Sequence, residues 1–160
     1  MPKVHLYLDL AQVVSRYATC HKLSVGCVLV KDERVLSLGY NGAPRGHPHC
    51  TEVGCDLVSV DGRDSCKRSV HAEANALLNA AYVGASTKGA ILYTTHSPCF
   101  DCAKLLLNAG VKELVFLTIY QDPRTWQLWT QPNTHPECPV FQQPLGDEQE
   151  VRVSHPKEPS

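Results

Sequence analysis

The chain has 160 residues, of which 43% are hydrophobic and 19% charged, so it is not disordered and suits one domain with a buried core. Its formal net charge of -1 disfavours a binder of nucleic acid polymers, because such proteins present strongly basic surfaces. No apolar run approaches the roughly 20 residues of a membrane-spanning helix, and there is no secretory signal, so we expect a cytoplasmic protein without a membrane partner.

The first half of the chain is predicted to hold a helix and a β-hairpin. Apolar residues between 6 and 17 recur at spacings of three and four, which is typical of a helix with one apolar face. Two β-like runs at 25–30 and 35–39 flank the charged turn 31–34, which predicts a hairpin. Residues 41–69 are predicted to form a long irregular loop, and a loop of that length is usually functional or anchored.

The second half alternates helices and strands, which indicates an α/β protein whose sheet is covered by helices, with parallel pairing in its later half. Gly84 and Gly110 follow two of the helices, where C-terminal glycines are typical. The predicted elements are a helix at 71–83, a strand at 90–95, a helix at 100–109, a strand at 113–118 and a short helix at 124–130.

The end of the chain is rich in proline, which predicts an irregular or partly disordered tail. Residues 150–153 are expected to add one short edge strand. We therefore divide the chain into a domain of residues 1–130 and a proline-rich tail of residues 131–160.

Two predicted helix starts carry the chemistry. His71 and Glu73 begin one helix, and Cys99 and Cys102 begin the next, directly after a strand. The two cysteines are three residues apart, so both thiolates can reach one ion from the first helical turn. With His71 they make three zinc ligands and leave a fourth position open for water, which is the catalytic pattern. Glu73 need not bind the metal and can transfer protons, as in the H-x-E…P-C-x-x-C signature of zinc nucleobase deaminases.

Over residues 5–120 the chain resembles the deoxycytidylate deaminases of the cytidine deaminase-like superfamily and the related late-competence proteins of bacteria. The motifs that carry the resemblance are HAEANA at 71–76, GYNG at 39–42 and SPCFDC at 97–102. The resemblance implies a three-layer α/β/α cytidine deaminase-like fold with a mixed central sheet of about five strands. It also implies zinc-dependent hydrolytic deamination of dCMP to dUMP and ammonia, which supplies thymidylate synthesis, with Glu73 moving the protons.

The same resemblance implies the substrate-binding residues. It places Asn41 at the sugar and Lys22 near the phosphate, where relatives often carry arginine, and it makes Ser24 and Tyr120 further candidates for the phosphate. The residues alone leave other interpretations open. Asn41 and Gly42 suit an ordinary turn, Lys22 suits a solvated surface charge, and Tyr120 suits an aromatic side chain packed at a strand end.

Regulation and assembly are likewise implied by the resemblance. Activation by dCTP with Mg²⁺ and inhibition by dTTP are expected at a nucleotide surface that includes Tyr40, Asn41 and Gly42. The chain is also expected to form a homo-oligomer, with dimers assembling into a hexamer.

Cysteine is unusually frequent, with eight residues in the chain, and four of them suggest a second zinc site. These four are Cys20, Cys50, Cys55 and Cys66. Thiols in a loop with little apolar core can anchor it through a structural zinc, although their spacing is not that of a zinc ribbon. Some bacterial and phage relatives carry a structural zinc at matching positions. His47, His49 or His96 is an alternative to one of the cysteines.

The remaining cysteines and histidines receive structural predictions or none. Cys27 is expected to be a buried apolar residue of its strand, and His96 to line the rim of the active site or pack against it. Cys138 has no expected partner. No role is assigned to His5, His21, His135 and His155.

Other functions stay open at this point. Among zinc deaminases they are a nucleoside cytidine deaminase, a tRNA adenosine deaminase and a guanine or pterin-type deaminase. The near-neutral charge disfavours the tRNA enzyme, and the GYNG motif together with Asn75 favours the nucleotide enzyme. From another class, the chain is a candidate for a catalytically silent zinc module that binds a protein partner. Glu73 argues against that module, because a structural zinc site needs no such carboxylate.

Overall fold

The computed structural model describes residues 3–120, 122–130, 140–141 and 151–154. The elements are α1 (Lys3–Ser15), β1 (Gly26–Lys31), β2 (Arg34–Tyr40), α2 (Cys50–Val53), β3 (Leu57–Val60), β4 (Arg63–Cys66), α3 (Ala72–Tyr82), β5 (Ile91–His96), α4 (Phe100–Asn108), β6 (Glu113–Thr118), α5 (Pro123–Thr130), β7 (Val140–Phe141) and β8 (Val151–Ser154).

The central sheet is mixed and has six strands in the order β2-β1-β5-β6-β8-β7. Among the described strands only β5 and β6 pair in parallel, and α4 makes the crossover between them, so the expected parallel pairing in the later half is confirmed. The strand expected at 150–153 is found as β8, but it pairs with β6 on one side and β7 on the other. The prediction that it forms the sheet edge is therefore wrong, because β7 lies outside it.

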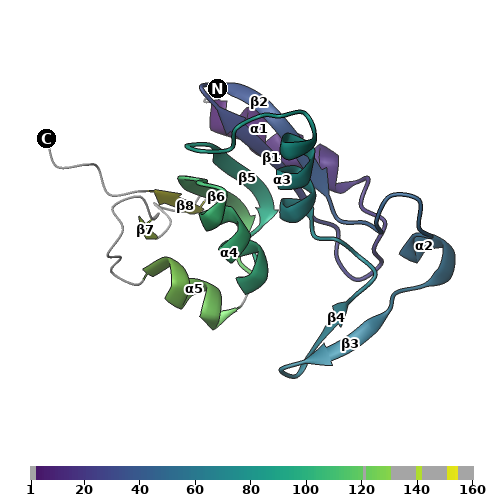
Figure 1. Ribbon diagram of the computed structural model, residues 1–160. Helices are drawn as coiled ribbons and strands as arrows, with labels where there is room; N and C mark the ends of the chain where they lie inside the picture. The colour runs from purple at the N-terminus through teal and green to yellow at the C-terminus, as the bar shows by residue number, and fades with distance from the viewer. Residues whose placement is uncertain (1–2, 121, 131–139, 142–150, 155–160) are drawn as a thin grey trace, which may run out of the picture.

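Helices cover both faces of this sheet, which confirms the three-layer α/β/α fold (Figure 1). The strands alternate, so Val28 and Tyr93 face α1 in one core cluster. Cys27, Leu29 and Leu92 belong to the other cluster, with residues of α3 and α4. Cys27 is fully buried there, as predicted.

The region 41–69 is not wholly irregular, and the prediction of a single long loop is wrong. It contains the short helix α2 and the antiparallel hairpin β3–β4, which projects away from the central sheet in Figure 1. Asp61 and Gly62 form the turn with φ values of 51° and 74°. Positive φ at both positions is typical of the type I′ turn, which an Asp-Gly pair between two β-prone runs favours.

The other helices and strands lie close to their predicted ranges. Gly84 and Gly110 have φ values of 73° and 74°, so both glycines provide the left-handed residue that ends a helix. Along the described residues, no helix is both long and apolar enough to cross a membrane. Cys138, His135 and His155 lie outside the described residues. The division of the chain at residue 130 stays a prediction.

The N-terminus of α3 is fixed on β2 by a very close approach of the two backbones. A Cβ atom at Gly39 would overlap the carbonyl oxygen of Ala72 and the backbone nitrogen of Ala76. Next to this contact, the Ser37 hydroxyl donates to the carbonyl oxygen of Ala76 at 2.7 Å, and the Asn75 amide donates to that of Tyr40 at 2.8 Å. Strand β2 thus determines where the first turn of α3 lies.

Gly39→Ala is expected to lower the free energy of unfolding by about 1 to 3 kcal/mol or more, because overpacking a close backbone contact forces α3 away from β2. Chemical denaturation measures the change. Leu38→Ala is the control on the same strand, since the Leu38 side chain is exposed and its loss should cost well under 1 kcal/mol. Equal stability of Gly39→Ala and the wild type would contradict the proposed role of this contact.

Candidate active site

The candidate catalytic ligands come from the starts of two helices. His71 is the N-cap residue of α3 and Cys99 that of α4, and Cys102 lies in the first turn of α4. The Nδ1 atom of His71 is 3.4 Å from the Sγ atom of Cys99 and 3.5 Å from that of Cys102. The fold therefore brings together three side chains that are 31 residues apart at most.

These three side chains fit a zinc ion. Tetrahedral zinc with ordinary bond lengths separates a ligating sulfur from a ligating nitrogen by about 3.6 Å, and both observed distances are close to that value. One of the two thiols, that of Cys99, ionises readily. The contact with the Cys102 thiol lowers the pKa of Cys99 to about 4, whereas that contact and burial raise the pKa of Cys102. A divalent cation would favour two thiolates in place of one.

Glu73 lies beside this group without belonging to it. Its side chain is buried, with 5% of the residue exposed, and burial raises the pKa of its carboxyl to about 7. Since Glu73 follows His71 by two residues at the first turn of α3, both side chains reach the same end of the helix. A carboxyl in this environment can accept and return a proton near neutral pH.

A pocket opens over Glu73 and His71, and most of the predicted substrate residues line it. Lys22, Asn41 and Tyr120 are among the lining residues, and so is His96, as expected for a residue at the active-site rim. Ser24 is exposed and is not among the described residues that line the pocket. The pocket therefore brings together all but one of the predicted substrate residues.

Asn41 holds one wall of this pocket in place. Its Oδ1 atom accepts the backbone N–H of Val25 at 2.8 Å, and its Nδ2 atom donates to the carbonyl oxygen of Leu23 at 2.6 Å. The buried amide thus fixes the segment that enters β1 next to Lys22. This positioning role adds to the predicted contact with the sugar.

The other two residues of the expected regulatory surface lie away from the pocket lining. The ring of Tyr40 is exposed and packs beside that of Tyr17, with ring centroids 6.4 Å apart. Gly42 forms an antiparallel bridge with Val70. Among the described residues of the GYNG motif, only Asn41 lines the pocket.

Several residues of the site were not predicted from the sequence. Ser97 is buried, lines the pocket, and accepts the backbone N–H of Tyr120 at 2.6 Å, so it links the metal-binding turn to the Tyr120 wall. Its place directly before the PCFDC run was the available signal. Asp64 and Ser65 line the pocket from β4. The Asp-Gly turn signal predicts their hairpin, but nothing in the sequence shows that it reaches the pocket.

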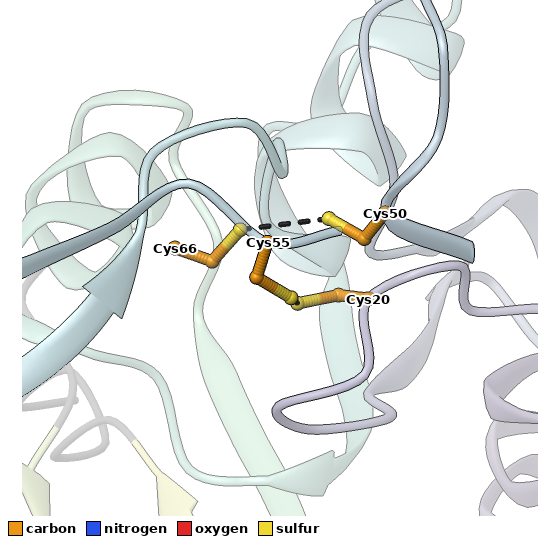
Figure 2. Close-up of side chains that lie close together, drawn as sticks. All are labelled: Cys20, Cys50, Cys55 and Cys66. Carbon is orange, nitrogen blue, oxygen red and sulfur yellow. Dashed lines mark hydrogen bonds between the residues drawn. The ribbon is translucent and has the colours of Figure 1, made fainter. Parts of the chain in front are cut away.

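The four remaining candidate ligands meet at a second centre, shown in Figure 2. The Sγ atoms of Cys20 and Cys55 are 3.7 Å apart, and those of Cys50 and Cys66 are 3.6 Å apart. Two sulfurs on one tetrahedral zinc are separated by about 3.8 Å, so this cluster has the size of a four-thiolate site. Burial raises the pKa of Cys50 to about 12. Burial also opposes ionisation of Cys66, but backbone N–H donors and the Cys50 thiol lower its pKa to about 7.

None of the three alternative histidines belongs to this cluster among the described residues. The Nδ1 atom of His49 is 2.9 Å from the hydroxyl of Thr19, and His96 lines the substrate pocket. The Nδ1 atom of His47 lies 3.4 Å from the carbonyl oxygen of Arg45. The histidine alternatives are therefore wrong, because all four cysteines already converge.

Residues 1–118 match the family model described as the cytidine and deoxycytidylate deaminase zinc-binding region. The chain belongs to this family. It is 36% identical over 115 residues to ComE operon protein 2 of Bacillus subtilis, covering 72% of this chain and 59% of that protein. It is 40% identical over 119 residues to deoxycytidylate deaminase of Schizosaccharomyces pombe, covering 71% of this chain and 36% of that protein. The chain thus spans less than two thirds of the length of both curated relatives.

A solved structure supports the same family assignment. The dCMP deaminase of cyanophage S-TIM5, in complex with dCMP and dUMP, superimposes with a TM-score of 0.68 at 32% identity. The match covers 82% of this chain and 93% of that chain. The resemblance to deoxycytidylate deaminases and the cytidine deaminase-like fold are therefore confirmed.

Cys102→Ser is expected to remove about one equivalent of bound zinc, because the open site would keep only two strong ligands. Elemental analysis of the purified protein measures the loss. Cys27→Ala is the matched control, since Cys27 is a buried cysteine of the core and belongs to neither ligand group. Unchanged zinc content in Cys102→Ser would show that this residue is not a ligand.

Proposed function

We propose that the chain catalyses the zinc-dependent hydrolytic deamination of dCMP to dUMP and ammonia. The observation that carries the proposal is the buried carboxyl of Glu73 at the floor of a pocket, beside His71, Cys99 and Cys102. A protein that only stores or displays zinc has no use for this carboxyl. The choice of dCMP is supported by family relatives that carry the name deoxycytidylate deaminase and by the relative solved with dCMP and dUMP.

Zinc bound by His71, Cys99 and Cys102 would lower the pKa of a water molecule toward about 7 and so supply a nucleophile. Glu73 accepts the proton of the attacking water and delivers it to N3 of the cytosine ring. After addition at C4, Glu73 takes the proton of the new C4 hydroxyl and transfers it to the amino group. The C4–N bond then breaks, ammonia leaves, and the C4=O bond of uracil forms. The sum of these steps is cytosine plus water giving uracil plus ammonia, with Glu73 regenerated.

Recognition of the nucleotide is proposed to involve the pocket walls. Asn41 is proposed to contact the sugar with the amide hydrogen that its bond to Leu23 does not use. Lys22 and Tyr120, which both line the pocket, are proposed to contact the phosphate. The exposure of Ser24 outside the described lining disfavours it as a phosphate ligand.

A second zinc is proposed at the four-cysteine cluster, where it would be structural, because four protein thiolates leave no open position. Two of its ligands, Cys20 and Cys66, also line the substrate pocket. Zinc here would therefore fix both the segment before Lys22 and the end of β4. Apolar packing gives the hairpin little other support, since β3 is exposed along its whole length.

Regulation, assembly and location are carried only by the family resemblance, and we retain them as proposals. They comprise activation by dCTP with Mg²⁺, inhibition by dTTP, assembly of dimers into a hexamer, and a cytoplasmic role in supplying dUMP. Tyr40 and Gly42 flank Asn41, so a nucleotide bound at these residues would act on the wall that Asn41 clamps.

Glu73→Gln is expected to keep both the fold and zinc but to lower turnover of dCMP by about 10⁴-fold or more, because general acid–base groups typically contribute 10²- to 10⁴-fold and this residue serves several transfers. Ammonia release from dCMP measures the loss, with zinc content and circular dichroism as controls. Cytidine, deoxycytidine and a tRNA anticodon stem tested with the wild type separate the other deaminase functions. Near-normal turnover by zinc-loaded Glu73→Gln would overturn the mechanism.

The purified chain is expected to contain two zinc ions, and Cys55→Ser is expected to retain one of them and to melt at a lower temperature. Structural zinc supplies folding free energy directly, so its loss destabilises the loop that it anchors. Elemental analysis and thermal denaturation test this together. A reproducible content of one zinc in the wild type would remove the second site.

A further inference from the structure

The hairpin β3–β4 forms one wall of the substrate pocket and is tied down at both ends. Cys66 at its base belongs to the four-cysteine cluster. At its tip, the carboxylate of Asp61 accepts from the guanidinium of Arg124 at 3.0 Å, and Arg124 also donates to Asp122 at 3.2 Å. An isolated two-stranded hairpin is marginally stable in water, so these two attachments determine its position.

Arg63 is the first residue of β4 and lies beside Tyr120. Its guanidinium carbon is 5.8 Å from the centroid of the Tyr120 ring, and Tyr120 lines the substrate pocket. Arg63 itself lines an adjoining hollow that shares Tyr120, His71 and Cys99 with that pocket. The arginine therefore belongs to the same opening as the candidate metal ligands.

The charges in the pocket call for a second cation. A phosphate monoester carries about -1.5 to -2 charges at pH 7. Among the described residues that line the pocket, Lys22 is the only lysine or arginine, and the carboxyl groups of Asp64 and Glu73 line it too. The single lysine beside these acidic groups does not balance the charge of a bound phosphate. Arg124 already forms ion pairs with Asp61 and Asp122, and through Asp61 it holds the tip of the hairpin.

We propose that Arg63 is a specificity-determining residue that binds the 5′-phosphate of the substrate from the hairpin wall, together with Lys22 of the pocket lining; this inference rests on the proposed function. The planar guanidinium presents a fork of N–H donors that matches phosphate oxygens, whereas a lysine offers a point charge. The Tyr120 ring packs against the Arg63 guanidinium, which places this cation next to a residue of the pocket lining.

The test compares kcat/KM for dCMP with kcat/KM for deoxycytidine, which has no phosphate. Arg63→Ala is expected to lower the value for dCMP about 10- to 150-fold, mainly through KM, as for loss of a charge-assisted hydrogen bond. Its value for deoxycytidine should stay within about twofold of the wild type, and Arg63→Lys should recover part of the loss. Arg34→Ala is the matched control, because Arg34 is an exposed arginine of β2 outside the described pocket linings.

A binding measurement separates this inference from the proposed function. Calorimetry with zinc-loaded protein compares dUMP with deoxyuridine and needs no turnover. If the wild type binds dUMP and deoxyuridine equally, the protein does not recognise the phosphate. Both the proposed substrate and the role of Arg63 would then be wrong. If the wild type prefers dUMP and the Arg63→Ala protein keeps that preference, only the role of Arg63 is overturned.

Two further outcomes also count against the inference. Equal losses on dCMP and deoxycytidine would mean that Arg63 acts through folding of the hairpin. A selective loss in Lys67→Ala but not in Arg63→Ala would assign the phosphate to Lys67, which lines the adjoining hollow. Arg63→Gln, which keeps the length and polarity of the side chain, replaces Arg63→Ala if the alanine variant melts at a lower temperature.

Discussion

The meeting of two helix N-termini at one end of the sheet is the constraint on which the site depends. Strand β2 holds the start of α3 through the close backbone approach at Gly39, and β5 leads directly into the turn that begins α4. The partial positive charge at each helix start favours thiolates and other anions there. The ligands are therefore set by backbone packing before any metal binds.

The four-cysteine cluster takes the place of a hydrophobic core for the region between β2 and α3. Strand β3 is exposed, and the hairpin gains no support from the core clusters that flank the sheet. Cross-linking by a metal would hold such a segment where burial of apolar surface cannot. Because Cys20 and Cys66 also line the pocket, the stability of this region and the shape of the substrate site are linked.

Burial divides the acidic residues of the site by role. Glu73 is enclosed, so its carboxyl retains a proton more readily than an exposed one would. Asp64 lies exposed on the hairpin wall. The polar groups that shape the walls, such as the Asn41 amide and the Ser97 hydroxyl, are largely engaged with backbone groups. Such bonds reduce the rearrangement needed when a substrate enters.

Local patterns in the sequence were sufficient for the alternation of helices and strands and for placing His71, Cys99 and Cys102 at helix starts, whereas the three-layer fold was implied by the family resemblance. These features depend on periodicity, on glycine at helix ends and on spacings within one turn, all of which act over a few residues. The four cysteines could also be grouped from the sequence. The sequence could not show that the candidate histidines lie outside this group. The Asp-Gly pair at 61–62 is a local signal for the hairpin turn, although the sequence-based prediction of an irregular loop did not include it.

Tertiary structure alone decided which strands are neighbours, that β8 lies inside the sheet edge, and that the candidate histidines stand apart from the cysteine cluster. It also decided that Asn41 holds the segment before β1, that Ser24 is not among the described residues that line the pocket, and that Arg63 lies over Tyr120. Each of these contacts joins residues far apart in the chain. Their geometry follows from how the layers pack, and no short stretch of sequence contains that information.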